Sequence, residues 1–378
     1  MSKALGVYVH WPYCARICPY CDFNVYKNRA IDAAAWKKAL TKDLSHWARR
    51  TGQGKLTSLY FGGGTPSRAP VEIIGHVIET CEFLWGFEQG AEITLEANPT
   101  DTEQLHFKEI ANAGVNRLSL GVQSLRDEAL AFLGRDHDAD AARRAIECAQ
   151  ETFARMTFDL IYARPRQTIE DWRAELTEAL AFGAGHLSLY QLMIEPATAF
   201  ARAVDKGRWA PLDDDRSADL FDATQELTAQ AGLPAYEISN HARPGDQSRH
   251  NLVYWTYGDY VGVGPGAHGR LSANGARIAT ETLARPEDYL TAAAANAPMH
   301  VEAPLSATEA NIERFSMGLR LIDGMALQPD DCFFEQGGAR EKLRRLVEDG
   351  FLIWNGELLK ASGNGRRLLN RVLYELLG

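Results

Sequence analysis

Three cysteines lie close together near the start of the chain, at Cys14, Cys18 and Cys21. Thiolates are soft ligands that favour iron–sulfur clusters or zinc. A structural zinc site usually completes four ligands, often as two pairs of cysteines, and no fourth cysteine lies at a local spacing here. Three ligands on a [4Fe–4S] cluster leave one iron open to a substrate or cofactor. The spacing therefore predicts such a cluster, with zinc or three packed thiols as the alternatives.

The other three cysteines (Cys81, Cys148 and Cys332) are scattered through apolar, helix-like segments, where they are expected to be small core residues. A tight cysteine cluster in a chain of 378 residues is typical of a reducing compartment rather than of a secreted disulfide scaffold.

With a net charge of −10, the chain lacks the broad basic surface of a general nucleic-acid binder. Neither a signal peptide nor a bilayer-spanning apolar stretch is recognisable, so we expect a cytoplasmic protein.

Strand-like runs alternate with amphipathic, helix-like segments through the first half of the chain. The expected strands are Gly6–His10, Thr57–Phe61, Glu92–Glu96, Arg117–Val122, Thr157–Tyr162 and His186–Leu192. Spacings of about 30–45 residues suit repeated βα units and a parallel sheet. The fold class predicted is α/β, with a partial parallel (β/α)6 barrel over residues 1–205.

Residues that could do chemistry stand at the ends of these strands. The cysteines follow the first strand, the run Gly62–Pro66 follows the second, Glu96 ends the third, Gln123 follows the fourth, and Asp159 lies in the fifth. In barrel enzymes the carboxyl ends of the strands form the mouth of the active site. We therefore expect one mouth to collect all of them.

The pattern changes after about residue 205. Residues 206–299 are interpreted as a connecting region packed on the barrel. Residues 300–378 read as helix, helix, short hairpin and helix, which predicts a small α+β, winged-helix-like C-terminal domain.

Together these motifs resemble the radical S-adenosylmethionine (SAM) superfamily, and within it the oxygen-independent coproporphyrinogen III dehydrogenase group. The matching segments are Tyr8–Pro12, Cys14–Phe23, Gly62–Pro66, Glu96–Pro99, Leu120–Ser124, Leu133–Arg135 and Phe158–Tyr162. The resemblance implies that the open iron takes SAM. By position, the SAM contacts it implies are Tyr8, Gly63, Gly64, Thr65, Glu96, Gln123, Arg135 and Asp159. Tyr20, beside the cluster, is expected to pack against adenine or to shield the cluster.

Two features direct the resemblance towards the HemW family of haem chaperones. The decarboxylating dehydrogenase has a further cysteine two places after its third ligand, where this chain has Phe23, and it has a longer N-terminal arm. The run from His250 to Trp255 matches the HNxxYW signature of HemW-like proteins. Imidazole is a haem-iron ligand, and Tyr254 and Trp255 offer flat apolar surface. We therefore predict a haem site at His250, Tyr254 and Trp255.

Three functions stay open on the sequence. The first is a haem-binding chaperone that passes haem to an apoprotein, membrane-bound or soluble, with an external electron donor for the cluster and with homodimer formation undecided. The second is coproporphyrinogen III dehydrogenase, which decarboxylates porphyrinogen propionates through a 5′-deoxyadenosyl radical. The third is a radical enzyme with another substrate.

Overall fold

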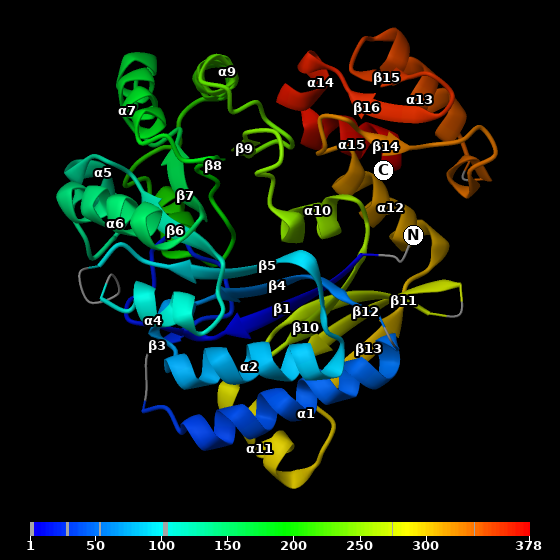
Figure 1. Cartoon of the computed structure of the whole chain (residues 1–378). Helices are drawn as coiled ribbons and strands as arrows, with labels where there is room; N and C mark the ends of the chain where they lie inside the picture. The colour runs from blue at the N-terminus through cyan, green and yellow to red at the C-terminus, as the bar shows by residue number, and fades with distance from the viewer. Residues whose placement is uncertain (1–3, 28–29, 53, 101–104, 274, 336) are drawn as a thin grey trace.

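The computed structural model describes residues 4–27, 30–52, 54–100, 105–273, 275–335 and 337–378. Its centre is a run of six neighbouring parallel strands, in the order in which they occur along the chain (Figure 1). These strands are β1 (Leu5–Trp11), β4 (Leu56–Gly63), β5 (Phe87–Ala97), β6 (Arg117–Gln123), β7 (Arg155–Tyr162) and β8 (His186–Gln191). All six were predicted from the sequence, and the partial parallel barrel is confirmed.

The barrel sheet does not close but continues at both edges, to 11 strands among the described residues. Beside β1 lies β10 (Asp259–Val263), in parallel, followed by the antiparallel strands β11 (His268–Ala273), β12 (Ala276–Thr282) and β13 (His300–Pro304). At the other edge β9 (Asn240–Ala242) pairs antiparallel with β8. The sequence pattern did not predict β12, since its residues read as linker and peripheral helix.

Helices cover the outer face of the sheet. On that face α1 (Ala33–Thr51), α2 (Val71–Leu84) and α11 (Pro286–Ala295) lie side by side (Figure 1). The crossover helices further along the chain are α4 (Phe107–Asn112), α5 (Asp127–Phe132), α6 (Ala139–Thr152), α7 (Ile169–Ala181), α8 (Ala199–Asp205) and α9 (Asp214–Gln230). Local sequence fixes several starts: Asp32 accepts a hydrogen bond from the Ala35 amide, and Thr168 and Asp171 form a capping box.

Alternation along the strands gives the barrel two different faces. Successive strand residues point to opposite sides, so residues two apart share a face. In β4, for example, Leu59 and Phe61 are buried under the helices, whereas Ser58 and Tyr60 point inward. The inner face is therefore polar enough to hold charged and hydroxylated side chains.

A short helix, α10 (Arg249–Trp255), packs against β1, β4 and β10 and separates the sheet from the C-terminal part of the chain (Figure 1). That part contains α12 (Ala307–Gly318), β14 (Met325–Ala326), α13 (Ala339–Glu348), β15 (Leu352–Trp354), β16 (Leu358–Ala361), α14 (Gly363–Arg367) and α15 (Leu369–Leu377). A hydrophobic core of its own joins these elements, centred on Phe315, Phe333 and Leu359. The single helix predicted over Gly363–Leu377 is two helices, and β14 was not predicted. The domain boundaries stay a prediction.

No helix among the described residues is both long and apolar enough to cross a membrane.

Candidate cofactor sites at the mouth of the barrel

A cavity of about 390 Å³ opens at the carboxyl ends of the barrel strands and collects nearly all the predicted site residues. Its lining includes Cys14, Cys18, Tyr20, Cys21, Gly63, Gly64, Thr65, Glu96, Gln123, Arg135 and Asp159. These residues come from six different segments of the chain, so the prediction that one mouth gathers them is supported by the fold. We call this space the cysteine cavity.

The three cysteines lie on a loop that begins at the short strand β2 (Tyr13–Cys14) and ends before β3 (Tyr26–Lys27). Thr65 donates to Cys14 Sγ (3.6 Å), and Arg135 Nη1 donates to Cys18 Sγ (3.2 Å). Burial raises the pKa of Cys14 and raises that of Cys21 to about 11. Thiols held protonated in this way gain most from a metal that stabilises the thiolate.

The donor set fits an iron–sulfur cluster. Within the described residues, no three histidine, cysteine or carboxylate side chains converge on the position of a single metal ion. The cysteine cavity offers three thiols and, among its described lining, no fourth cysteine or histidine. Three soft ligands around a roomy cavity match a cluster that keeps one iron for a ligand.

Gly63 and Gly64, at the end of β4, leave no room for a Cβ atom because the segment from His10 to Tyr13 packs against them. Gly63 has φ +104°, and a Cβ atom there would lie 2.5 Å from the ring of His10. At Gly64 a Cβ atom would meet the carbonyl oxygen of Tyr13 at 2.6 Å. The resemblance implies that Gly63 and Gly64 contact SAM, and a residue without Cβ allows the backbone to approach a ligand closely. In the structure they also let the strand end press against the segment that carries Cys14.

Two carboxylates face the cysteine cavity from neighbouring units. Glu96 accepts hydrogen bonds from the Tyr60 hydroxyl (2.8 Å) and the Gly63 amide (3.1 Å). Burial raises the pKa of both Glu96 and Asp159 to about 7, and the charge of Asp159 adds to the effect on Glu96. A cationic ligand would stabilise both in the ionised form. The ammonium and sulfonium groups of SAM have that charge.

Arg135, which contacts Cys18, and Gln123 also line the cysteine cavity. Arg135 Nη2 donates to the carbonyl of Gly121 (2.9 Å) and to Asn98 Oδ1 (2.6 Å), and its Nε is buried without a partner. Gln123 has φ +69°, a strained conformation for a residue other than glycine. Strain of this kind is often kept where a side chain must point into a site.

A second cavity, of about 560 Å³, adjoins the first, and Asp22 and Phe23 line both. Its walls are mostly aromatic and include Tyr8, His10, Tyr254, Trp255, Tyr257, Tyr260 and His268. Tyr254 and Tyr260 pack edge to face with ring centres 4.4 Å apart. The two arginines of the lining are already paired, Arg270 with Glu313 (2.7 Å) and Arg277 with Asp259. We call this space the aromatic cavity.

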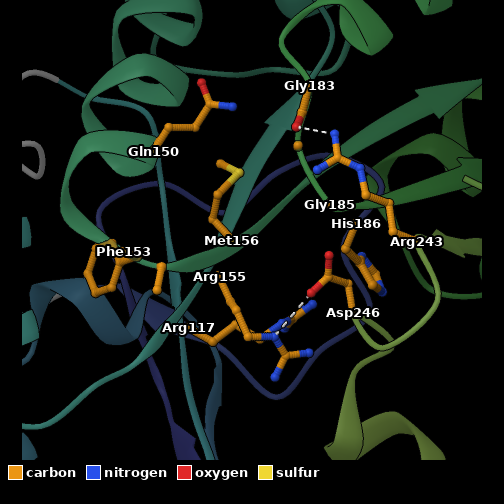
Figure 2. A pocket seen from close by; sticks show the side chains of 12 residues that line it. Arg117, Gln150, Phe153, Arg155, Met156, Gly183, Gly185, His186, Arg243 and Asp246 are labelled. Atoms are coloured by element: carbon orange, nitrogen blue, oxygen red, sulfur yellow. Dashed lines mark hydrogen bonds and ion pairs between the residues drawn. The ribbon is translucent and has the colours of Figure 1, made fainter. Parts of the chain in front are cut away.

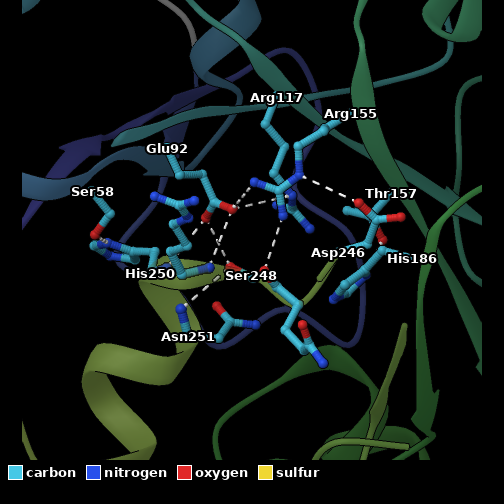
Figure 3. Close-up of polar contacts among 12 residues, drawn as sticks. Ser58, Glu92, Arg117, Arg155, Thr157, His186, Asp246, Ser248, His250 and Asn251 are labelled. Atoms are coloured by element: carbon cyan, nitrogen blue, oxygen red, sulfur yellow. Dashed lines mark hydrogen bonds and ion pairs between the residues drawn. The ribbon is translucent and has the colours of Figure 1, made fainter. Parts of the chain in front are cut away.

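His250 does not reach the aromatic cavity. It is buried against Tyr60, and its Nδ1 hydrogen-bonds to Ser58 Oγ (2.8 Å), a pair that Figure 3 shows. Its Nε2 hydrogen-bonds to the Tyr254 hydroxyl. Burial lowers the pKa of the ring to about 3, so it is neutral. With both nitrogens engaged, His250 is not placed as a haem ligand in this conformation. Tyr254 and Trp255 do line the cavity, as the sequence predicted.

Tyr8 lines the aromatic cavity, and its hydroxyl hydrogen-bonds to His10 Nδ1 (3.1 Å). Its ring centre lies 6.2 Å from that of Tyr60 and 6.4 Å from that of His250. Its assignment as a SAM contact stays a prediction. The strand alternation that turns Tyr8 inward was visible in the sequence, but which of two adjoining cavities it enters was not.

Asn98, Ser119 and Tyr190 are polar residues of the cysteine cavity that were not singled out from the sequence. Ser119 and Tyr190 lie two and four residues after inward-facing positions of β6 and β8, so strand periodicity could have found them. Asn98 follows Glu96 at the strand end and belongs to a motif already quoted, and its role with Arg135 appears only in three dimensions.

The comparisons with known proteins agree with this geometry. Residues 8–179 match the family model described as the radical SAM superfamily. The heme chaperone HemW of Haemophilus influenzae is 33% identical over 98% of this chain and 97% of its own length. The chain belongs to the radical SAM superfamily and, within it, to the family of HemW.

Further relatives extend this family placement. The radical S-adenosyl methionine domain-containing protein 1, mitochondrial, of Dictyostelium discoideum is 36% identical, with 99% of this chain and 94% of that protein covered. The solved structure of Escherichia coli coproporphyrinogen III oxidase HemN superposes with a TM-score of 0.81, over 99% of this chain and 90% of that one. At 21% identity, the HemN likeness establishes the fold alone.

The cofactors follow from the family and from the cavity. As a radical SAM protein the chain carries a [4Fe–4S] cluster and binds SAM, and its HemW relatives connect it with haem. Cys14, Cys18 and Cys21 would hold the cluster, which supplies an open iron and an electron when bound. Glu96 and Asp159 are the carboxylates of the cysteine cavity that would face the positive charge of SAM, and Arg135 is fixed beside Cys18.

Proposed function

We propose that this chain is a haem chaperone, which holds haem in the aromatic cavity and passes it to a haem-requiring apoprotein. The observation that carries the proposal is the aromatic cavity itself. Its volume of about 560 Å³ lies in the range of cofactor sites, and its walls offer the flat apolar surface that a porphyrin ring needs. It shares Phe23 with the cysteine cavity, so haem would lie beside the cluster.

An axial ligand for the haem iron is available at His268. Two histidines line the aromatic cavity. His10 uses both nitrogens, on Tyr8 and on the carbonyl of Asn24 (2.9 Å), whereas the ring of exposed His268 makes no hydrogen bond to any described residue. An imidazole free to turn is the one that can ligate iron. In this proposal His250 instead positions Tyr254 in the wall.

The names of the relatives support the haem-chaperone proposal. Several proteins about 33–34% identical over nearly the whole chain are named heme chaperones, among them those of Escherichia coli and Mycobacterium tuberculosis. The alternative, decarboxylation of coproporphyrinogen III, has in its favour the fold shared with HemN. Against it stands Phe23, in the place where the decarboxylating enzyme has a cysteine.

The setting of the proposed function follows the sequence prediction. An external reductant would supply the cluster's electron, and a haem-requiring apoprotein, soluble or membrane-bound, would accept the haem. We propose the cytoplasm as the working compartment because all six cysteines are free thiols and an oxygen-sensitive cluster needs a reducing environment. The mitochondrial names of some relatives make fractionation the direct test.

The experiment is a haem titration of the anaerobically reconstituted protein, followed by the Soret band. His268→Ala should weaken haem binding by at least about tenfold and change the Soret position, whereas His106→Ala, at an exposed surface position, should not. Coproporphyrinogen III turnover is assayed on the same samples. Stoichiometric haem binding without decarboxylation supports the chaperone. Vinyl-forming decarboxylation with loose haem binding would make the chain a porphyrin-pathway enzyme instead.

A further inference from the structure

A third cavity lies at the opposite end of the barrel from the cofactor sites. It has a volume of about 230 Å³ and shares no lining residue with the cysteine cavity or the aromatic cavity. Arg117, Arg155 and His186 line it, near the amino ends of β6, β7 and β8, and Arg243 and Asp246 close it from the loop after β9 (Figure 2). The amino end of a barrel usually serves stability alone, so a cavity rich in cations there needs a reason.

The main feature of this cavity is the guanidinium of Arg117. Its side chain is only 3% exposed, yet it donates no hydrogen bond to any described residue. Arg117 forms an ion pair with Glu92, whose Oε2 atom lies 3.7 Å from Arg117 Nε, beyond hydrogen-bond distance. A guanidinium has five N–H donors, so this side chain can still donate to a bound acceptor. The protein keeps this group beside a cavity that an acceptor could fill.

Glu92 cannot satisfy Arg117, because its oxygens are already in use. They accept hydrogen bonds from the Ser248 hydroxyl (3.1 Å) and from the backbone amides of Arg249 and His250 (3.2 Å each), at the start of α10 (Figure 3). Arg155 Nη1 donates to the same carboxylate at 3.0 Å. The Glu92 carboxylate therefore accepts its hydrogen bonds from the start of α10 and from Arg155, and none from Arg117.

The charges around the cavity do not balance. Three guanidiniums (Arg117, Arg155 and Arg243) face two carboxylates, and Asp246 lies 3.7 Å from Arg155 Nε. Arg243 donates only to the carbonyl of Gly183 (2.9 Å). His186 adds no charge, because burial lowers its pKa and both ring nitrogens are engaged, by Thr157 (2.7 Å) and the Tyr236 hydroxyl (3.0 Å). One positive charge is left over.

We propose that this cavity binds a small oxyanion of the phosphate class, held by Arg117, Arg155 and Arg243. The planar guanidinium matches phosphate oxygens through paired N–H donors, and such charge-assisted bonds are the strong ones. Arg117 and Arg155, from neighbouring strands, and Arg243, from a loop and turned toward Gly183, all line the cavity (Figure 2). The bound anion accepts the hydrogen bonds that Arg117 lacks, and it ties the loop that carries Arg243 to the barrel.

The test measures binding of inorganic phosphate to the full-length, cluster-loaded protein by calorimetry, with potassium chloride at matched ionic strength as the blank. Arg117→Gln and Arg243→Gln should each weaken saturable phosphate binding by at least about tenfold. Arg249→Gln is the matched control: it removes the same charge from an exposed residue nearby that does not line the cavity, and it should leave binding unchanged. Malonate in a parallel titration distinguishes a phosphate site from a general carboxylate site.

If Arg117→Gln fails to fold, Arg243→Gln still tests phosphate binding. Arg243 is exposed, and the one hydrogen bond of its side chain is to a loop carbonyl. Saturable phosphate binding lost in Arg243→Gln and kept in Arg249→Gln supports the proposal. Binding that does not exceed the chloride blank, equal binding in all variants, or tighter binding of malonate than of phosphate would overturn it.

Discussion

His250 and Tyr254 lie one turn apart on α10, and the Tyr254 hydroxyl hydrogen-bonds to the Nε2 atom of His250. The other ring nitrogen is held by Ser58, a residue 192 positions earlier in the chain. The signature that contains both residues is therefore internally bonded in this structure. Its first residue fixes the helix to the sheet, and its aromatic residues form the wall of the aromatic cavity.

This relationship predicts the effect of Tyr254→Phe. The substitution leaves Nε2 of a fully buried imidazole without a partner, which should lower the free energy of unfolding by about 1–3 kcal/mol. Urea unfolding of the apoprotein measures the change. Tyr257→Phe is the control, because its hydroxyl contacts the partly exposed Glu313 at 3.3 Å, and its removal should cost less. Equal stability of the two variants would contradict the pairing.

Much of the barrel was predictable from local pattern. The six parallel strands follow from short β-rich runs at regular spacing, and their carboxyl ends must meet at one mouth because the strands are parallel. The pattern failed from β10 to β14, none of which was predicted as a strand. β12 forms a hairpin with β11, and the two-residue strand β14 is ordered by pairing with β16, more than 30 residues further along the chain.

The site residues also divide into those that local sequence predicts and those that depend on contacts between distant segments. Cysteine spacing and strand ends predicted the lining of the cysteine cavity, since both are local. The engagement of His250 by Ser58 and the orientation of Tyr8 depend on contacts between remote segments. A histidine next to two aromatic residues is typical of a haem ligand, and only the fold shows that its nitrogens are already bonded.

The cysteines should divide sharply by function. Cys14→Ala, Cys18→Ala and Cys21→Ala should each prevent stable assembly of the cluster, because the remaining thiols cannot hold it. Cys148→Ala, on helix α6 outside the cofactor cavities, should keep a full iron content. Iron and sulfide analysis after anaerobic reconstitution gives the result. Loss of iron in Cys148→Ala, or its retention in all three loop variants, would refute the assignment.

SAM affinity should depend on pH through Glu96 and Asp159. Both carboxyls have a pKa raised to about 7, so they are largely protonated below that pH and ionised above it. A cationic ligand binds the ionised form, and affinity should therefore fall as the pH is lowered from 8 to 6, by up to about tenfold per pH unit for each carboxyl that must ionise.

Equilibrium binding of SAM to the cluster-loaded protein checks this dependence. Glu96→Gln should bind SAM more weakly at pH 8 and show a flatter pH profile. Glu109→Gln, on the exposed surface of α4, should reproduce the wild-type profile. A wild-type affinity that stays constant between pH 6 and 8 would mean that neither carboxyl faces the positive charge of the ligand.

Gly63→Ala tests whether the end of β4 is shaped by its neighbours. The new methyl group would meet the His10 ring at 2.5 Å on a backbone with φ +104°, so both overlap and strain oppose it. We expect a loss of about 2–4 kcal/mol in unfolding free energy. Gly52→Ala is the matched control, since φ is +71° there and nothing lies within 4 Å of the added Cβ atom.

Strain alone at Gly52, with φ +71° and ψ −162°, should cost about 1–3 kcal/mol. The difference between the two variants therefore isolates the contact with His10, whose Nε2 holds the loop carbonyl of Asn24 beyond the cysteines. Thermal unfolding of both apoproteins measures that difference. If Gly63→Ala is destabilised as expected, its cluster content should fall too, because the displaced His10 no longer supports the cysteine loop. Equal losses of stability in the two variants would show that the His10 ring can move aside at no cost and that this contact does not hold the end of β4.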